Sequence, residues 1–182
     1  VGRGIPDRPT HIAPERFFGQ SIIVTGAAQG IGLAVAQRIA HEDGNLVLVD
    51  RSEIVHEVAE ELRGVGKGTV DSFTTDLESY QGALDTIAFA QTKLNNLDIV
   101  INNVGGTIWA KPFQEYTEEE ITKEIQRSLF PTLWMCRATL PCLIDNGGGT
   151  IVNVSSIATG GVNRVPYAAA KGGVNGIVSA LA

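Results

Sequence analysis

The chain has 182 residues, of which 43% are hydrophobic and 19% are charged, and its formal net charge is −6. This length suits one domain with a sizeable core, and the hydrophobic content excludes a wholly disordered chain. The acidic balance, with no Lys/Arg-rich run, gives no basis for a nucleic-acid or anionic-membrane partner, and no apolar run reaches the roughly 20 residues that span a bilayer.

Residues 1–17 show no clear hydrophobic period and are expected to form an N-terminal tail. From residue 18 onward, short β-branched runs alternate with helical patterns, which predicts one α/β domain over 18–182 built on a doubly wound parallel sheet, a Rossmann fold. Because no strand pattern follows the last helix, we expect this sheet to be C-terminally incomplete and the segment alone to have weak activity or none. Strands are predicted at 22–25, 46–49, 68–74, 97–102 and 150–154, and helices at about 31–41, 53–62, 79–93, 117–143 and from 166 onward.

Neither the cysteines nor the histidines form a recognisable metal or disulfide pattern. Cys136 and Cys142 lack the partners of a zinc site or a disulfide framework. His11, His41 and His56 are scattered along the chain, so no metal site is predicted. With no signal-peptide pattern at the N-terminus, a cytoplasmic location is expected.

A glycine-rich bend follows the first predicted strand, in the segment TGAAQGIG. Gly26, Gly30 and Gly32 allow a sharp turn and a close approach of the backbone to a pyrophosphate. The helix that follows offers free N–H groups and a positive dipole end to the phosphates. The alternative is a tight turn that serves only helix packing, because the spacing Gly-x-x-x-Gly-x-Gly departs from the commoner dinucleotide fingerprint.

Two acidic residues at strand ends fit the adenosine half of a dinucleotide. Asp50 closes the second strand, where a carboxylate accepts hydrogen bonds from the ribose hydroxyls and repels a 2′-phosphate, which favours NAD over NADP. Arg51 weakens this preference because an arginine is able to receive that phosphate. Asp76 follows the third strand, where it either reaches the adenine amino group or caps the next helix. An ordinary strand-end acid remains the alternative for Asp50.

Tyr167 and Lys171 are four residues apart in a predicted helix and therefore share one face. An ammonium held near a phenol stabilises the phenolate, which is then able to take a proton from an alcohol while hydride leaves the carbon. Ser155 and Ser156 lie upstream at a strand end, where a hydroxyl is able to hold the substrate oxygen or merely cap a turn.

Taken in this order, TGAAQGIG, Asp50, the segment NNVG, the segment NVSS and the Tyr167–Lys171 pair resemble the short-chain dehydrogenases/reductases over about residues 18–182. The resemblance implies a Rossmann fold, NAD as cofactor and a homo-oligomer, commonly a tetramer. It implies that Tyr167 is the base, that Lys171 assists it and holds the ribose, and that Ser156 orients the substrate. Cofactor contacts are expected at Gly26, Gly30, Ile31, Gly32, Asp50, Asp76, Leu77, Asn103, Tyr167 and Lys171.

Three further segments, NNVGGTIWAKPF, RSLFPTLW and VNRVPYAAAKGGVN, resemble the subfamily that oxidises cis-diols of benzoate. That resemblance implies an anionic cyclic diol as substrate, oxidised to a β-keto acid that loses CO₂ and becomes a catechol. The alternatives are another reductase of the family, such as a 3-oxoacyl or sugar-alcohol reductase, and a dinucleotide-binding protein without catalysis.

One catalytic position departs from the family pattern. Where the family usually has Asn in the fourth helix, this chain has Ser128. Pro131 cannot donate to the carbonyl of Arg127, so we expect a kink that leaves backbone acceptors free. Our hypothesis is that this carbonyl or Ser128 itself holds a water that links Lys171 to solvent. The alternative is that Ser128 is merely a small helix residue.

A substrate carboxylate in a net acidic chain calls for a local cation. Arg164, shortly before Tyr167, is the favoured candidate, and Arg127 and Lys111 are the others. Each of these side chains is equally consistent with an ordinary solvated cation. Trp109 is expected either to wall an apolar ring site or to pack within its own loop.

Overall fold

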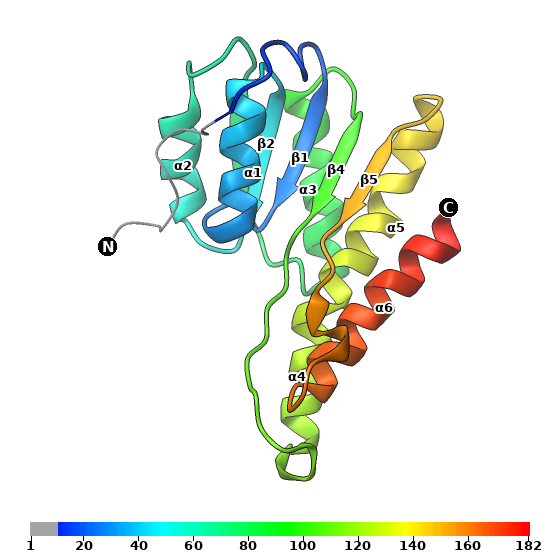
Figure 1. Ribbon diagram of the computed structural model, residues 1–182. Helices are drawn as coiled ribbons and strands as arrows, with labels where there is room; N and C mark the ends of the chain where they lie inside the picture. Colours follow the sequence, from blue (N-terminus) through cyan, green and yellow to red (C-terminus); the bar gives the residue numbers. More distant parts are fainter. Residues whose placement is uncertain (1–10) are drawn as a thin grey trace.

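Five strands pair in parallel in the order β3-β2-β1-β4-β5 in the computed structural model, which describes residues 11–182 (Figure 1). The predicted doubly wound fold is confirmed. The elements are β1 (Ser21–Thr25), α1 (Gly30–His41), β2 (Asn45–Asp50), α2 (Ile54–Leu62), β3 (Val70–Thr74), α3 (Tyr80–Lys93), β4 (Ile99–Asn102), the 3₁₀ turn η1 (Phe113–Glu115), α4 (Glu118–Ser128), α5 (Phe130–Asp145), β5 (Thr150–Asn153), the 3₁₀ turn η2 (Ile157–Gly160) and α6 (Val165–Leu181).

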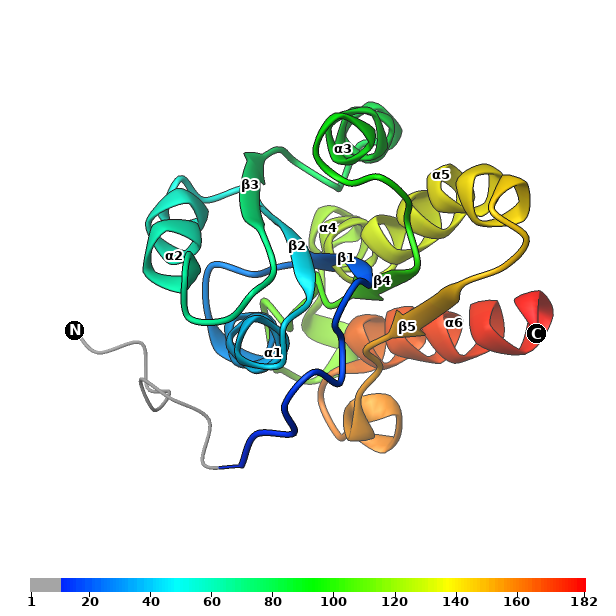
Figure 2. The ribbon, with the colours of Figure 1, turned by 90° about the horizontal axis from the view of Figure 1, so that it is seen from above.

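Two hydrophobic cores cover the two faces of the sheet. In β1 the buried side chains alternate, so that Ile22 and Val24 face α1 and α2 while Ile23 faces α3 and α5. Figure 2 shows these two helix layers on opposite sides of the strands. α6 packs against α4 and α5 and lines a surface hollow with Leu143 and Ile151 of the second core, so it lies on the side of α5. Burial on both faces explains why the central strands are apolar throughout rather than alternating with polar residues.

The strand order reverses between β1 and β4. The chain runs outward from β1 through β2 to β3, then crosses back to place β4 on the other side of β1. In open α/β sheets the crevice at such a switch point, outside the carboxyl ends of the strands, is where ligands bind. The fold thereby assigns the binding edge before any side chain is considered.

The helix expected over 117–143 is two helices rather than one kinked helix. α4 ends at Ser128 and α5 begins at Phe130, with Leu129 at φ −115° between them. Pro131 lies in the first turn of α5, where its missing N–H would have had no helical partner. The proline therefore starts a new helix instead of bending an existing one.

The described part of the predicted tail is fastened to the domain. Glu42 is buried at the end of α1, accepts a hydrogen bond from the backbone N–H of Ala13 at 2.7 Å and pairs with Arg16 at 3.4 Å. Phe17 packs against the first core, whereas Phe18 is 63% exposed. Residues 1–10 of the expected tail lie outside the described residues. Between residues 11 and 182 no helix combines the length and the apolar character needed to cross a membrane.

Candidate active site

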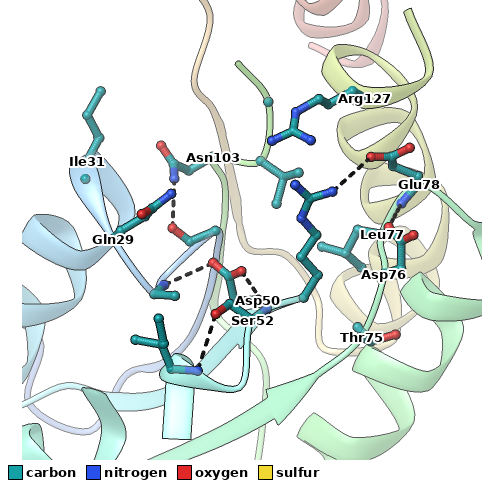
Figure 3. Close-up of a pocket in the computed structure, with 17 residues that line it drawn as sticks. Gln29, Ile31, Asp50, Ser52, Thr75, Asp76, Leu77, Glu78, Asn103 and Arg127 are labelled. Carbon is teal, nitrogen blue, oxygen red and sulfur yellow. Dashed lines mark hydrogen bonds and ion pairs between the residues drawn. The ribbon is translucent and has the colours of Figure 1, made fainter. Parts of the chain in front are cut away.

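A cleft of about 420 Å³ opens at the switch point (Figure 3). It is formed by the bend after β1 and by the segments that follow β2, β3 and β4, with one contribution from α4. Seven residues expected to contact a cofactor line it, namely Gly26, Gly30, Ile31, Asp50, Asp76, Leu77 and Asn103.

The glycine bend is shaped by close backbone contacts. Gly26 has a φ of +66° and Gly30 a φ of +59°. A residue with a Cβ adopts this backbone region only with strain. Gly32 does not line the cleft but packs beneath it, because a Cβ there would lie 2.1 Å from the carbonyl oxygen of Gly26. Asn103 fixes the bend to β4, since its side-chain amide donates to that same oxygen at 3.3 Å. The bend is thus held as an open cradle beside the N-terminus of α1.

Asp50 lines the cleft, and its carboxylate is still able to accept further hydrogen bonds there. Its two carboxylate oxygens accept backbone N–H groups of Ala28 and Ser52, each at 3.0 Å. A carboxylate offers about four acceptor sites, so both oxygens are still able to accept ribose hydroxyls. Arg51, which sequence reasoning treated as a rival receptor for a 2′-phosphate, pairs with Glu78 at 3.7 Å.

For Asp76 the structure excludes the helix-cap interpretation and leaves the contact with the adenine amino group as a prediction. It lines the cleft, and its carboxylate also accepts the backbone N–H of Glu78 at 2.9 Å. The N-cap of α3 is Ser79, whose hydroxyl accepts from the N–H of Gly82 at 3.0 Å. Asp76 therefore stabilises the turn before the helix rather than the helix terminus itself.

Lys171 lies behind Gly105 and does not itself line the cleft. It is 2% exposed, its ammonium donates to the carbonyl of Val154 at 2.8 Å, and burial lowers its pKa. Gly105 lines the cleft, and a Cβ added there would lie 3.0 Å from Nζ of Lys171. The wall of the cleft and the ammonium are therefore in direct contact, with no side chain between them.

The other residues of the expected catalytic set gather around β5 and α6. Tyr167 is half-buried in the first turn of α6, one turn before Lys171. Ser156 accepts the N–H of Ala158 at 3.1 Å and caps η2, while Ser155 donates to the carbonyl of Lys171 at 3.2 Å. Tyr167, Ser156 and the exposed Arg164 lie outside the lining of the cleft, beyond its Gly105 end.

Ser128 acts on the loop after β4. The side chain is fully buried, and its hydroxyl lies 3.4 Å from both the N–H and the carbonyl oxygen of Gly106. A Cβ on Gly105 would also come within 3.5 Å of the Cα of Ser128. Ser128 therefore holds the segment that touches Lys171, and the water link to Lys171 stays a prediction.

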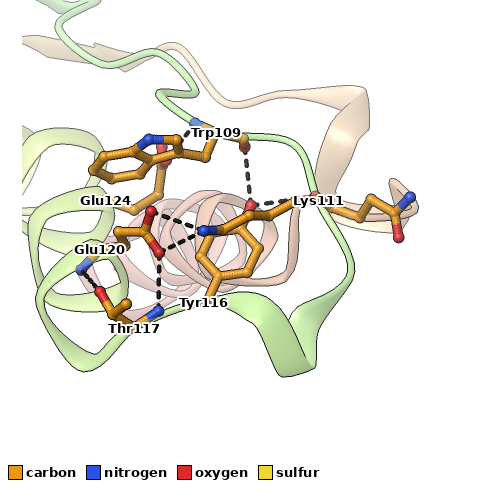
Figure 4. A network of polar contacts seen from close by, with 7 residues as sticks. Trp109, Lys111, Tyr116, Thr117, Glu120 and Glu124 are labelled. Atoms are coloured by element: carbon orange, nitrogen blue, oxygen red, sulfur yellow. Dashed lines mark hydrogen bonds and ion pairs between the residues drawn. The ribbon is translucent and has the colours of Figure 1, made fainter.

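Glu124 is a site residue that sequence reasoning missed. Its carboxylate is fully buried and accepts the backbone N–H of Ile108 at 2.9 Å and of Trp109 at 3.4 Å (Figure 4). The available signal was its spacing, since Glu124 lies four residues before Ser128 and shares its helix face. Together the two side chains anchor the loop between β4 and α4.

The same loop is also joined to the segment before α6. The hydroxyl of Tyr116 lies within hydrogen-bond distance of the carbonyls of Trp109, at 3.0 Å, and Asn163, at 3.2 Å. Lys111 pairs with Glu120 at 2.7 Å, as Figure 4 shows, and this hydrogen bond lowers the pKa of Glu120. The ammonium of Lys111, one of the three candidate cations, is therefore already neutralised.

A parallel switch-point sheet, a glycine cradle and a Tyr167–Lys171 pair beside it define a class of protein. The chain belongs to the short-chain dehydrogenase family, whose model matches residues 20–182.

Individual members of this family are similar to the chain. A protein of Pseudomonas putida named 1,6-dihydroxycyclohexa-2,4-diene-1-carboxylate dehydrogenase is 56% identical over 168 residues, which is 92% of this chain and 62% of that protein. A protein of the same name from Acinetobacter baylyi is 53% identical over 92% of this chain and 64% of its own length. The crystal structure of an NAD⁺-bound xylitol dehydrogenase matches with a TM-score of 0.84 and 25% identity, over 89% of this chain and 63% of that one. The chain spans less than two thirds of the length of these relatives.

Proposed function

We propose that this protein oxidises a cis-dihydrodiol carboxylate derived from benzoate, with NAD as the hydride acceptor, and that catechol and CO₂ are the products. The observation that carries the proposal is the contact between the cofactor cleft and the buried Lys171 at Gly105. The similarity to two dehydrogenases named for this diol supports the choice of substrate.

The residues of the cleft fit NAD. The bend at Gly26 and Gly30 leaves room for a pyrophosphate, because a Cβ on Gly30 would meet no atom within 4 Å. Asp50 would accept the two ribose hydroxyls and repel a 2′-phosphate. Arg51 also lines the cleft, and its ion pair with Glu78 at 3.7 Å offsets part of the charge that would otherwise attract that phosphate.

The bound cofactor would supply a ring carbon that accepts hydride. Tyr167 would take the proton of the substrate hydroxyl, and Ser156 would donate a hydrogen bond to the same oxygen. Lys171, one turn further along the same helix, would assist the base and hold the ribose of the cofactor. Loss of one hydride and one hydroxyl proton turns the secondary alcohol into a ketone, and this is the only redox step.

The later steps need little from the protein. The new carbonyl stands beta to the carboxylate and accepts the electron pair left behind when the bond to CO₂ breaks. The resulting enolate takes up one proton and becomes catechol, so that the diol anion and NAD⁺ give catechol, CO₂ and NADH without a net proton. Aromaticity drives this sequence forward.

Arg164 is the cation that we propose for the substrate carboxylate. It stands at the N-cap position of α6, shortly before Tyr167, and its side chain is exposed. The contacts of the two rival cations support this choice, since Lys111 pairs with Glu120 and Arg127 lines the cofactor cleft.

The test follows NADH absorbance with the full-length protein and a panel of cis-diols with and without a carboxylate. We expect turnover of the benzoate diol with NAD and a loss of at least tenfold in kcat/KM for Arg164→Ala, confined to substrates that carry a carboxylate. The exposed Arg137→Ala on α5 is the matched control. Turnover only of acyl or sugar-alcohol substrates, or NAD binding with no turnover of any diol, would reject the proposal.

A homo-oligomer, a tetramer when full length, and a cytoplasmic location remain predictions of the family resemblance and of the sequence. Light scattering on the purified protein tests the first, and fractionation of cells that express it tests the second.

A further inference from the structure

Arg127 lies in the cofactor cleft rather than with the catalytic pair. It belongs to the last turn of α4, is half-buried and contributes the lining that faces the glycine bend. Figure 3 shows its side chain directed from α4 into the cleft, between Asn103 and Glu78 in this view. A side chain expected to serve a substrate carboxylate thus faces the site of a different ligand.

The charge of Arg127 is not used within the described part of the chain. Arg51 pairs with Glu78 and Lys111 pairs with Glu120, whereas no carboxylate of residues 11–182 lies within ion-pair distance of Arg127. A half-buried guanidinium that lines a cleft without a carboxylate partner suits a bound anion, to which it offers several planar N–H donors.

The position of α4 tells which part of a dinucleotide Arg127 would meet. Glu78 lines the cofactor cleft. It also lines a surface hollow whose other residues lie within 118–126 of α4, so α4 runs beside Glu78. The adjoining Asp76 and Leu77 lie on the adenosine side, next to Asp50. The nicotinamide side is marked by Gly105 and Lys171, and Gly105 also approaches Ser128, the residue that follows Arg127. Arg127 therefore lies between the two sides, where a dinucleotide carries its phosphates.

We propose that Arg127 binds the adenosine diphosphate half of the cofactor and is a binding residue for the dinucleotide rather than for the substrate. This inference rests on the proposed function to the extent that the cleft holds a dinucleotide. It adds a cation on the wall opposite the glycine bend, so that the phosphates are held by backbone N–H groups on one side and by a guanidinium on the other.

The experiment measures the dissociation constants of ADP and of nicotinamide mononucleotide by isothermal titration calorimetry, which needs no turnover. Arg127→Ala is compared with the wild type, with Arg127→Lys and with Arg137→Ala, which removes the same charge from α5. Circular dichroism establishes that each variant is folded.

We expect Arg127→Ala to weaken ADP binding about tenfold or more, with partial recovery in Arg127→Lys and no change in Arg137→Ala. Binding of nicotinamide mononucleotide and the KM of the diol should stay within twofold of the wild type. An ADP constant unchanged by Arg127→Ala, or a loss that falls on the mononucleotide or the diol, would overturn the inference while leaving the proposed function intact. If the wild type binds no ADP, the proposed function fails as well.

Discussion

Replacing the glycines of the bend one at a time separates stability from cofactor binding. Gly32→Ala would place a Cβ 2.1 Å from the carbonyl oxygen of Gly26 and 2.6 Å from the amide nitrogen of Asn103, far inside ordinary contact distance. Both partners are held in place by a hydrogen bond to one another. Overpacking of this kind commonly lowers the free energy of unfolding by about 1–3 kcal/mol. Because the carbonyl of Gly26 is backbone and cannot move aside easily, we expect a loss of about 3 kcal/mol for Gly32→Ala.

Gly30→Ala perturbs the same bend differently. A Cβ there meets nothing within 4 Å, so the expected loss is only the strain of a φ of +59° on an alanine, about 1–2 kcal/mol. That Cβ projects into the open cleft, however, and should weaken dinucleotide binding. Gly176→Ala on α6 is the control, with an expected gain of about 0.5–1 kcal/mol because it combines open space with a helical backbone.

Urea unfolding gives the three free energies, and calorimetry with ADP gives the affinities. The reasoning predicts that Gly32→Ala loses more stability than Gly30→Ala, and that Gly30→Ala loses affinity out of proportion to its stability. A Gly32→Ala variant as stable as Gly30→Ala would refute the claim that backbone contact at 2.1 Å dictates glycine.

Two other side chains give separate predictions. Lys171→Met should remove turnover. Because burial lowers the pKa of Lys171 from its ordinary 10.5, the native protein releases that proton before the unfolded chain does, so the stability of the wild type relative to this variant should rise as the pH increases toward 10.5 in urea titrations. Glu124→Ala leaves the N–H groups of Ile108 and Trp109 without their acceptor and should cost about 1–3 kcal/mol, with a changed tryptophan emission and a higher KM for the diol. Glu124→Gln keeps one acceptor oxygen and should recover part of each loss, and equal effects of the two variants would speak against the loop anchor.

Local patterns in the sequence were sufficient for the fold and for much of the cofactor cleft. Runs such as the one around Ile23 are apolar on both faces, which only a parallel strand covered by helices on both sides satisfies. The bend from Gly26 to Gly32 and the acid at Asp50 lie at strand ends, and in a parallel sheet all carboxyl ends meet at one edge. Their joint position therefore follows from the order of elements along the chain.

The roles of individual polar side chains were decided by tertiary packing. Sequence proximity grouped Arg127 with the other cations, yet the end of α4 places it in the cofactor cleft, and Lys111 finds Glu120 across the turn before that helix. Ser128 meets Gly106, and Glu124 meets the loop beyond it. These contacts join α4 to the loop that precedes it, across 9 to 22 residues of chain. The hydrophobic period of a helix predicts which of its faces is buried. Only the packed structure shows which backbone groups that face contacts.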